Sequence, residues 1–193
     1  MKTYFLALAL LFLPLTAQAA TAKASFAMGC FWCAEHDFEK VAGVTDVVSG
    51  YEGGAKETAT YEQVSQGDTG HYETVEVTYD TAKTDYKKLL AVFWDNVDPF
   101  DGEGQFCDKG KQYAAIIFVS NKDERKLAQE SFDALQARHK DQKVMVKILD
   151  AKPFYAAEGY HQNFAETNKV HYGLYRAGCG RDSKLEEIHK ISN

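Results

Sequence analysis

Cys30 and Cys33, near the start of the chain, have the spacing of a redox-active pair. They enclose Phe31-Trp32 and follow a short apolar run, residues 25–28, that gives way to a helical pattern. A C-x-x-C pair at a helix start more often does redox or metal chemistry than forms a structural bridge. Because the unpaired backbone N–H groups of a helix start favour the thiolate, Cys30 is a candidate nucleophile with a lowered pKa.

The two aromatic residues between the cysteines have two interpretations. Phe31 and Trp32 stand at a helix start, where solvent-facing residues are expected, and would there form an apolar floor for a ligand beside the Cys30 sulfur. An aromatic pair at this place could equally cap the hydrophobic core and touch no ligand. The pattern leaves both interpretations open.

Glu73 is a candidate proton donor because of the strand pattern around it. Residues 72–79 alternate, so that Glu73 shares a face with Val75 and Val77. If this face is buried, the desolvated carboxyl keeps its proton near neutral pH, as a general acid must. If Glu73 instead lies beyond the rim of the sheet, it is simply solvated.

Cys107 and Cys179 are isolated cysteines in glycine-bearing segments. Cys107 lies in the acidic loop 98–111, and Cys179 lies in Gly178-Cys179-Gly180. A structural zinc site usually needs a second closely spaced ligand pair, so the cysteines predict neither a metal nor another cofactor. Two interpretations remain: a general thiol-disulfide oxidoreductase of thioredoxin type, or a cysteine that acts on a small substrate group while a second cysteine clears the product.

Size and composition indicate a single globular domain. The 193 residues suffice for one well-buried domain and are too few for two ordinary ones. Hydrophobic residues make up 45% and charged residues 26% of the chain, which is typical of a globular rather than a disordered protein. The net charge of -6 argues against nucleic acid or an anionic membrane as a partner.

The first 19 residues have the pattern of a cleavable signal peptide. Lys2 supplies a positive start, residues 4–15 are apolar but too few to span a bilayer, and Ala17-Gln18-Ala19 is a small-x-small cleavage site. We therefore expect cleavage after Ala19 and export to the periplasm or the outside of the cell. The mature domain would span residues 20–193, with no membrane attachment and with a tail from about residue 168.

The remaining periodicities predict the element order β-α-β-β-α-β, followed by α-β. The predicted strands are the run that ends at Met28 and residues 44–51, 72–79, 112–119 and 143–149; the predicted helices follow Cys33, Asp85 and Asn121, and the aromatic segment 154–164 is also predicted to be helical. The first six elements match a ferredoxin-like arrangement. We therefore expect a two-layer α/β sandwich with an additional helix and strand and an irregular C-terminal tail.

Several motifs, taken together, resemble the A-type peptide methionine sulfoxide reductases. These motifs are Gly29-Cys30-Phe31-Trp32, Tyr51-Glu52-Gly53-Gly54, Thr60-Tyr61, Gly67-Asp68-Thr69-Gly70-His71-Tyr72-Glu73, Phe93-Trp94-Asp95, Asp98-Pro99, Gly110-Lys111-Gln112-Tyr113 and Pro153-Phe154-Tyr155-Ala156-Ala157-Glu158. They occur in the family's order over roughly residues 24–167. The resemblance implies a protein-repair enzyme of oxidative stress that restores methionine from the S epimer of its sulfoxide, and it implies the α/β sandwich as the fold.

The resemblance also implies roles for individual residues. Cys30 would attack the sulfoxide sulfur, and Glu73 would protonate the sulfoxide oxygen. The phenols that hydrogen-bond this oxygen would be Tyr61 and Tyr113, and the aspartate that orders the site would be Asp108. The substrate methyl group would lie against Phe31 and Trp32.

Recycling of the oxidised nucleophile is where the chain departs from the commonest family pattern. Many relatives carry glycine at the position of Cys33 and recycle through cysteines in the C-terminal tail. Here Cys33 is expected to resolve the Cys30 sulfenic acid, with Cys179 as the alternative or relay and Cys107 as a third candidate. The resemblance implies thioredoxin or a thioredoxin-like protein as the reductant, and we expect a monomer.

Overall fold

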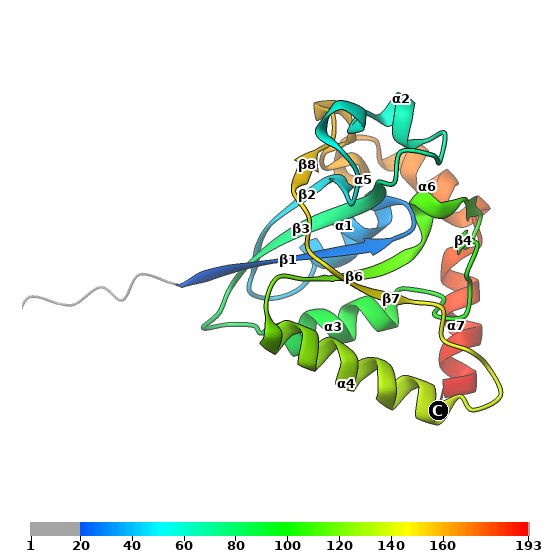
Figure 1. Ribbon diagram of the computed structural model, residues 1–193. Helices are drawn as coiled ribbons and strands as arrows, with labels where there is room; N and C mark the ends of the chain where they lie inside the picture. Colours follow the sequence, from blue (N-terminus) through cyan, green and yellow to red (C-terminus); the bar gives the residue numbers. More distant parts are fainter. Residues whose placement is uncertain (1–19, 193) are drawn as a thin grey trace, which may run out of the picture.

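Strand β1 (Thr21–Met28) lies inside a six-stranded sheet and ends two residues before Cys30 (Figure 1). The computed structural model describes residues 20–192. The strand order is β7-β6-β1-β3-β2-β8, and the other strands are β2 (Val44–Glu52), β3 (Tyr72–Asp80), β6 (Ala115–Val119), β7 (Lys147–Asp150) and β8 (Phe154–Ala156). All pairings are antiparallel except that of β6 with β7. The expected signal peptide, residues 1–19, lies outside the described residues.

The expected ferredoxin-like core is confirmed. Helix α1 (Phe31–Glu39) connects β1 to β2, and helix α3 (Tyr86–Asp95) lies between β3 and β6. The four strands of this unit have the order β6-β1-β3-β2, and helix α4 (Lys122–Arg138) with β7 supplies the additional helix and strand. The central strands alternate, so one face packs on the helices; the buried core there includes Phe26, Met28, Val75, Val77, Ile117, Phe38, Leu89 and Phe93.

The aromatic segment 154–164 is not helical throughout, which corrects the prediction. Its first residues form strand β8, which pairs with the edge of β2 and aligns Ala156 with Gly50. A single turn at Gly159–His161 and the short helix α5 (Phe164–Thr167) follow, separated by Asn163 with φ 52°. The free edge of β2 satisfies its backbone hydrogen bonds with β8, and this pairing overrides the helical pattern.

The C-terminal tail is helical rather than irregular, a second correction. Helices α6 (Lys169–Gly178) and α7 (Arg181–Ser192) form it, and the left-handed Gly180 (φ +67°) marks the corner between them. Arg181 is 1% exposed and donates to the carbonyl oxygens of Met28 and Asn96 at 3.2 and 2.5 Å. These contacts join the start of α7 to the end of β1 and to the end of α3. None of the helices in the described part of the chain has the length and apolar character to cross a bilayer.

Candidate active site

Cys30 is the N-cap residue of α1, so it stands at the start of the helix as predicted. Gly29 before it has φ +82°, and a side chain there would come within 2.6 Å of Gln105, so the turn requires glycine. The Cys30 carbonyl oxygen accepts the backbone N–H groups of Cys33 and Ala34 at 3.1 and 3.3 Å, which starts the helix. The Cys30 residue is only 6% exposed, so its sulfur is almost completely covered.

Glu73 lies on the buried face of β3 and reaches the same helix start. It is 3% exposed, and its Oε2 accepts the backbone N–H of Phe31 at 3.0 Å. Burial raises the pKa of Glu73 to about 8, and the nearby negative charge of Asp108 adds to this, although the Phe31 hydrogen bond acts in the opposite direction. The buried interpretation of Glu73 is therefore confirmed, and the carboxyl holds a proton at neutral pH.

The two thiols of the C-x-x-C pair are hydrogen-bonded to each other. Burial raises the pKa of Cys30, and the bond to Cys33 acts in the same direction. The hydrogen bond from Cys30 lowers the pKa of Cys33, and the charges of Arg181 and Arg176 also lower it. The expectation of a lowered pKa for Cys30 is wrong for the substrate-free site, because burial outweighs the helix start. Transfer of one proton from Cys30 to Cys33 would place the charge on the nucleophile.

Tyr61 and Tyr113 approach this site from two separate loops. Tyr61 begins the short helix α2 (Tyr61–Val64), and its backbone N–H donates to Glu158 Oε1 at 2.9 Å. Tyr113 ends a single 3-10 turn, Lys111–Tyr113, before β6. Burial raises the pKa of both phenols, and the charges of Glu73 and Cys30 raise both further. Each phenol therefore keeps its proton and remains a hydrogen-bond donor.

Of the two aromatic residues between the cysteines, Phe31 packs in the core and Trp32 lies at the site. Phe31 is 1% exposed and packs in the main core, which supports the core-capping interpretation for this residue. Trp32 is only partly buried; its indole ring stacks on Phe164 with 3.8 Å between ring centroids. The indole N–H donates to His161 Nδ1 at 3.1 Å, so the ring orientation is fixed. The expected apolar surface beside Cys30 thus rests mainly on Trp32.

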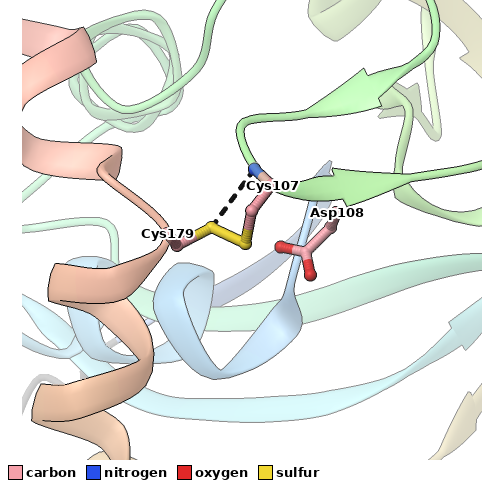
Figure 2. Close-up of side chains that lie close together, drawn as sticks. All are labelled: Cys107, Asp108 and Cys179. Carbon is pink, nitrogen blue, oxygen red and sulfur yellow. Dashed lines mark hydrogen bonds between the residues drawn. A yellow bond between two sulfur atoms is a disulfide. The ribbon is translucent and has the colours of Figure 1, made fainter.

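Asp108 and the remaining cysteines meet on the two-stranded hairpin β4 (Gly104–Gln105) and β5 (Asp108–Lys109), as Figure 2 shows. Cys107 and Cys179 form a disulfide, and the Cys107 backbone N–H lies 3.2 Å from the Cys179 sulfur. The Asp108 carboxylate lies within 4.8 Å of both sulfurs, a spacing that metal ligands also have. Because the two sulfurs are bonded to each other, neither is a thiolate free to hold an ion.

Tyr175 of α6 is a site residue that the sequence did not indicate. Its hydroxyl donates to Asp108 Oδ2 at 2.5 Å, and its side chain also hydrogen-bonds with Cys30. An irregular tail has no helix faces, so the expected tail gave Tyr172, Tyr175 and Cys179 no common face. That spacing of three and four residues is the signal that would have found it.

A buried thiol pair, a protonated carboxyl beside it and a second, more exposed cysteine pair define a thiol-dependent oxidoreductase. A family model described as "Peptide methionine sulfoxide reductase" matches residues 22–192. The chain belongs to the peptide methionine sulfoxide reductase family.

Individual relatives agree with this membership. The chain is 47% identical to peptide methionine sulfoxide reductase MsrA 2 of Caulobacter vibrioides over 91% of this chain and 89% of that protein. It is 45% identical to MsrA of Bacillus subtilis over 85% and 93% of the two chains. The reduced form of Mxr1 from Saccharomyces cerevisiae superposes with a TM-score of 0.72 at 28% identity over 77% and 86% of the chains. Methionine sulfoxide reductase A of Corynebacterium diphtheriae gives 0.69 at 28% identity over 80% and 78%.

Proposed function

We propose that the protein reduces the S epimer of methionine sulfoxide, free or within oxidised proteins, to methionine. The observation that carries the proposal is the position of Glu73: a buried carboxyl that keeps its proton is bonded to the amide that follows Cys30. Oxygen leaves sulfur readily only when it is protonated as the bond weakens. A thiol and a neutral acid at one helix start supply both requirements of a deoxygenation.

The proposed chemistry proceeds in two balanced steps. The Cys30 thiolate attacks the sulfoxide sulfur while Glu73 donates its proton to the oxygen and Tyr61 and Tyr113 hydrogen-bond to it. Methionine leaves, and the oxygen remains on the Cys30 sulfur, which is now a sulfenic acid. A second thiol then condenses with this sulfenic acid, and a disulfide and one water molecule result.

The proposal is tested by offering the reduced protein a peptide that carries both epimers of methionine sulfoxide, with dithiothreitol as reductant. Loss of oxygen is followed by mass spectrometry after the epimers are separated. Conversion of the S epimer alone is the expected result. Equal conversion of both epimers, or of neither, would contradict the proposal. If a protein disulfide were reduced while both sulfoxides remained, the general thiol-disulfide interpretation would replace it.

Burial of the thiol pair argues against that general interpretation. Cys30 and Cys33 are 6% and 1% exposed, so the sulfur atoms offer little surface to another protein's disulfide. The side chain of methionine sulfoxide is thin enough to enter a covered site, whereas a folded disulfide-bearing partner is not. The family membership points in the same direction.

We propose Cys33 as the first thiol to resolve the Cys30 sulfenic acid. The two sulfurs are already hydrogen-bonded, so the condensation needs no movement of the tail. The Cys107–Cys179 pair would then act as a relay. The Cys179 thiol attacks the Cys30–Cys33 disulfide, Cys107 closes the second disulfide, and both buried thiols are restored.

In this relay the disulfide is transferred from the buried Cys30–Cys33 pair to the Cys107–Cys179 pair, which a reducing protein can contact. Cys107 is exposed, whereas Cys30 and Cys33 are buried. A dithiol protein could therefore reopen the Cys107–Cys179 disulfide without entering the active site. We propose thioredoxin or a thioredoxin-like protein as this reductant; a solved structure of yeast Mxr1 holds that protein in complex with Trx2.

Replacement of Cys33 by serine is expected to slow recycling rather than the first reduction. With thioredoxin as reductant, steady-state turnover should fall by at least roughly tenfold, because the Cys30 sulfenic acid then waits for a distant thiol. Dithiothreitol, which can reach the sulfenic acid itself, should restore much of the rate and serves as the control. An unchanged rate with thioredoxin, with an intramolecular disulfide still formed, would assign resolution to Cys179 or Cys107.

Export and the monomeric state belong to the same proposal. The pattern of residues 1–19 supports cleavage after Ala19, and the chain would then act outside the cytoplasm, where an envelope protein of thioredoxin type supplies the electrons. N-terminal sequencing of the exported protein should begin at Ala20. An intact Met1 on the exported protein would contradict cleavage after Ala19.

A further inference from the structure

Helix α6 and the β4–β5 hairpin are joined at two neighbouring points. Cys107 and Asp108 are consecutive in the hairpin, while Tyr175 and Cys179 lie one helical turn apart on the helix. The first point is the covalent Cys107–Cys179 bond, and the second is the hydrogen bond from Tyr175 to Asp108 at 2.5 Å. Because Tyr175 and Cys179 lie one turn apart on the same face of α6, the disulfide fixes the position of Tyr175 along the helix axis relative to the hairpin.

Tyr175 extends from this junction to the nucleophile. Its hydroxyl hydrogen-bonds with the Cys30 side chain, and its ring lies edge-on to Trp32 at a centroid distance of 5.7 Å. A phenol has one proton to donate, so Asp108 and Cys30 compete for it. When Cys30 is a neutral thiol the proton goes to Asp108, and when Cys30 becomes a thiolate the negative sulfur is the stronger acceptor.

We propose that Tyr175 is a further catalytic residue: its hydroxyl stabilises the Cys30 thiolate, and the Cys107–Cys179 disulfide holds it in place for this role. The inference rests on the proposed function, which makes Cys30 the nucleophile. With this role, the C-terminal helices contribute to the attack of Cys30 on the sulfoxide as well as to the later reduction of the Cys30–Cys33 disulfide. It also links the redox state of the exposed disulfide to the reactivity of the buried thiol.

Other contacts hold the two C-terminal helices when the disulfide is open. Arg176 pairs with Asp37 at 3.1 Å, and buried Arg181 binds the carbonyl oxygen of Met28. Tyr172 packs against Cys33 in a small separate cluster. When the disulfide is opened, these contacts therefore keep α6 packed on the domain, and only its covalent attachment to the hairpin is lost. The effects of the disulfide and of the Tyr175 hydroxyl on Cys30 can then be compared in one set of variants.

The test measures alkylation of Cys30 by iodoacetamide as a function of pH, with the modified peptide quantified by mass spectrometry. Four proteins form a double-mutant cycle: the wild type with its disulfide, Tyr175→Phe, Cys107→Ser with Cys179→Ser, and the combination of all three changes. Tyr79→Phe removes a phenol at the far end of β3 and is the matched control. No sulfoxide is present, so failure here is distinct from failure of the proposed function, which the epimer assay reports.

Tyr175→Phe is expected to slow alkylation of Cys30 at pH 7.5 by about tenfold and to move the midpoint of the pH profile upward, because one hydrogen bond to a charged group is lost. The same change should have less than about a threefold effect once the disulfide is absent. Tyr79→Phe should match the wild type. An unchanged or faster alkylation in Tyr175→Phe would overturn the role of the hydroxyl. Equal effects with and without the disulfide would overturn the role of the disulfide.

Discussion

Replacement of Cys30 by serine is expected to lower sulfoxide reduction by at least about a thousandfold, because the nucleophile itself is lost. An alcohol at this position has a far higher pKa than a thiol and attacks sulfur poorly. The neighbouring thiol of Cys33 is not expected to take over, since Cys33 is 1% exposed and is covered even more completely than Cys30. The measurement is the initial rate of oxygen loss from the S epimer with dithiothreitol.

The control for Cys30→Ser is the fold of the variant. The exchange of sulfur for oxygen in a residue that is 6% exposed should leave the far-ultraviolet circular dichroism and the thermal midpoint close to those of the wild type. A folded variant that kept more than a few per cent of the wild-type rate would show that another group attacks the sulfoxide.

Replacement of Glu73 by glutamine is expected to reduce the rate by about a hundred- to ten-thousandfold, the range that a general acid contributes. The amide keeps the shape of the side chain and can still accept the Phe31 N–H, but it has no acidic proton to give. Glu76→Gln is the matched control. Glu76 lies on the same strand, faces the opposite side and pairs with Lys23 at the surface.

The pH dependence of the wild type follows from the same carboxyl. The active form of Glu73 is the protonated one, and its pKa is about 8. Ionisation of the thiol pair raises kcat/KM with pH in both proteins, whereas loss of the Glu73 proton lowers it only in the wild type as the pH rises through about 8. The ratio of the wild-type rate to that of Glu73→Gln should therefore fall in this range, and this alkaline limb is the predicted signature of Glu73. The comparison uses kcat/KM, which reports the free enzyme. An alkaline limb of equal size in the variant would assign it to another group.

Local patterns in the sequence were sufficient for the order of the elements and for the position of Cys30, whereas they left the burial of Glu73 open. Alternation in β1 and β3 and helical periodicity after Cys33 predicted the β-α-β-β-α-β order, because each element buries one face. The same alternation placed Glu73 on the face of Val75, and the structure shows that both are buried. The position of Cys30 at a helix start followed from the change at Gly29 from a strand-like apolar run to a helical pattern.

What the sequence could not predict depends on contacts between distant segments. The raised pKa of Cys30 results from burial, to which segments more than 100 residues away contribute, and a helix-start argument does not include them. The role of Tyr175 likewise depends on the meeting of α6 with the β4–β5 hairpin. The glycines on either side of Cys179 favoured an irregular tail, whereas Gly178 ends α6 and the left-handed Gly180 marks the corner before α7.

The account as a whole is tested most directly by a single turnover in the variant with Cys33→Ser, Cys107→Ser and Cys179→Ser, where Cys30 is the last remaining thiol. The protein is mixed with the S epimer in the presence of dimedone, which traps sulfenic acids, and each peptide is analysed by mass spectrometry. One methionine per protein, with the adduct on Cys30, is the predicted result. Methionine formed while Cys30 stays a free thiol would contradict the account.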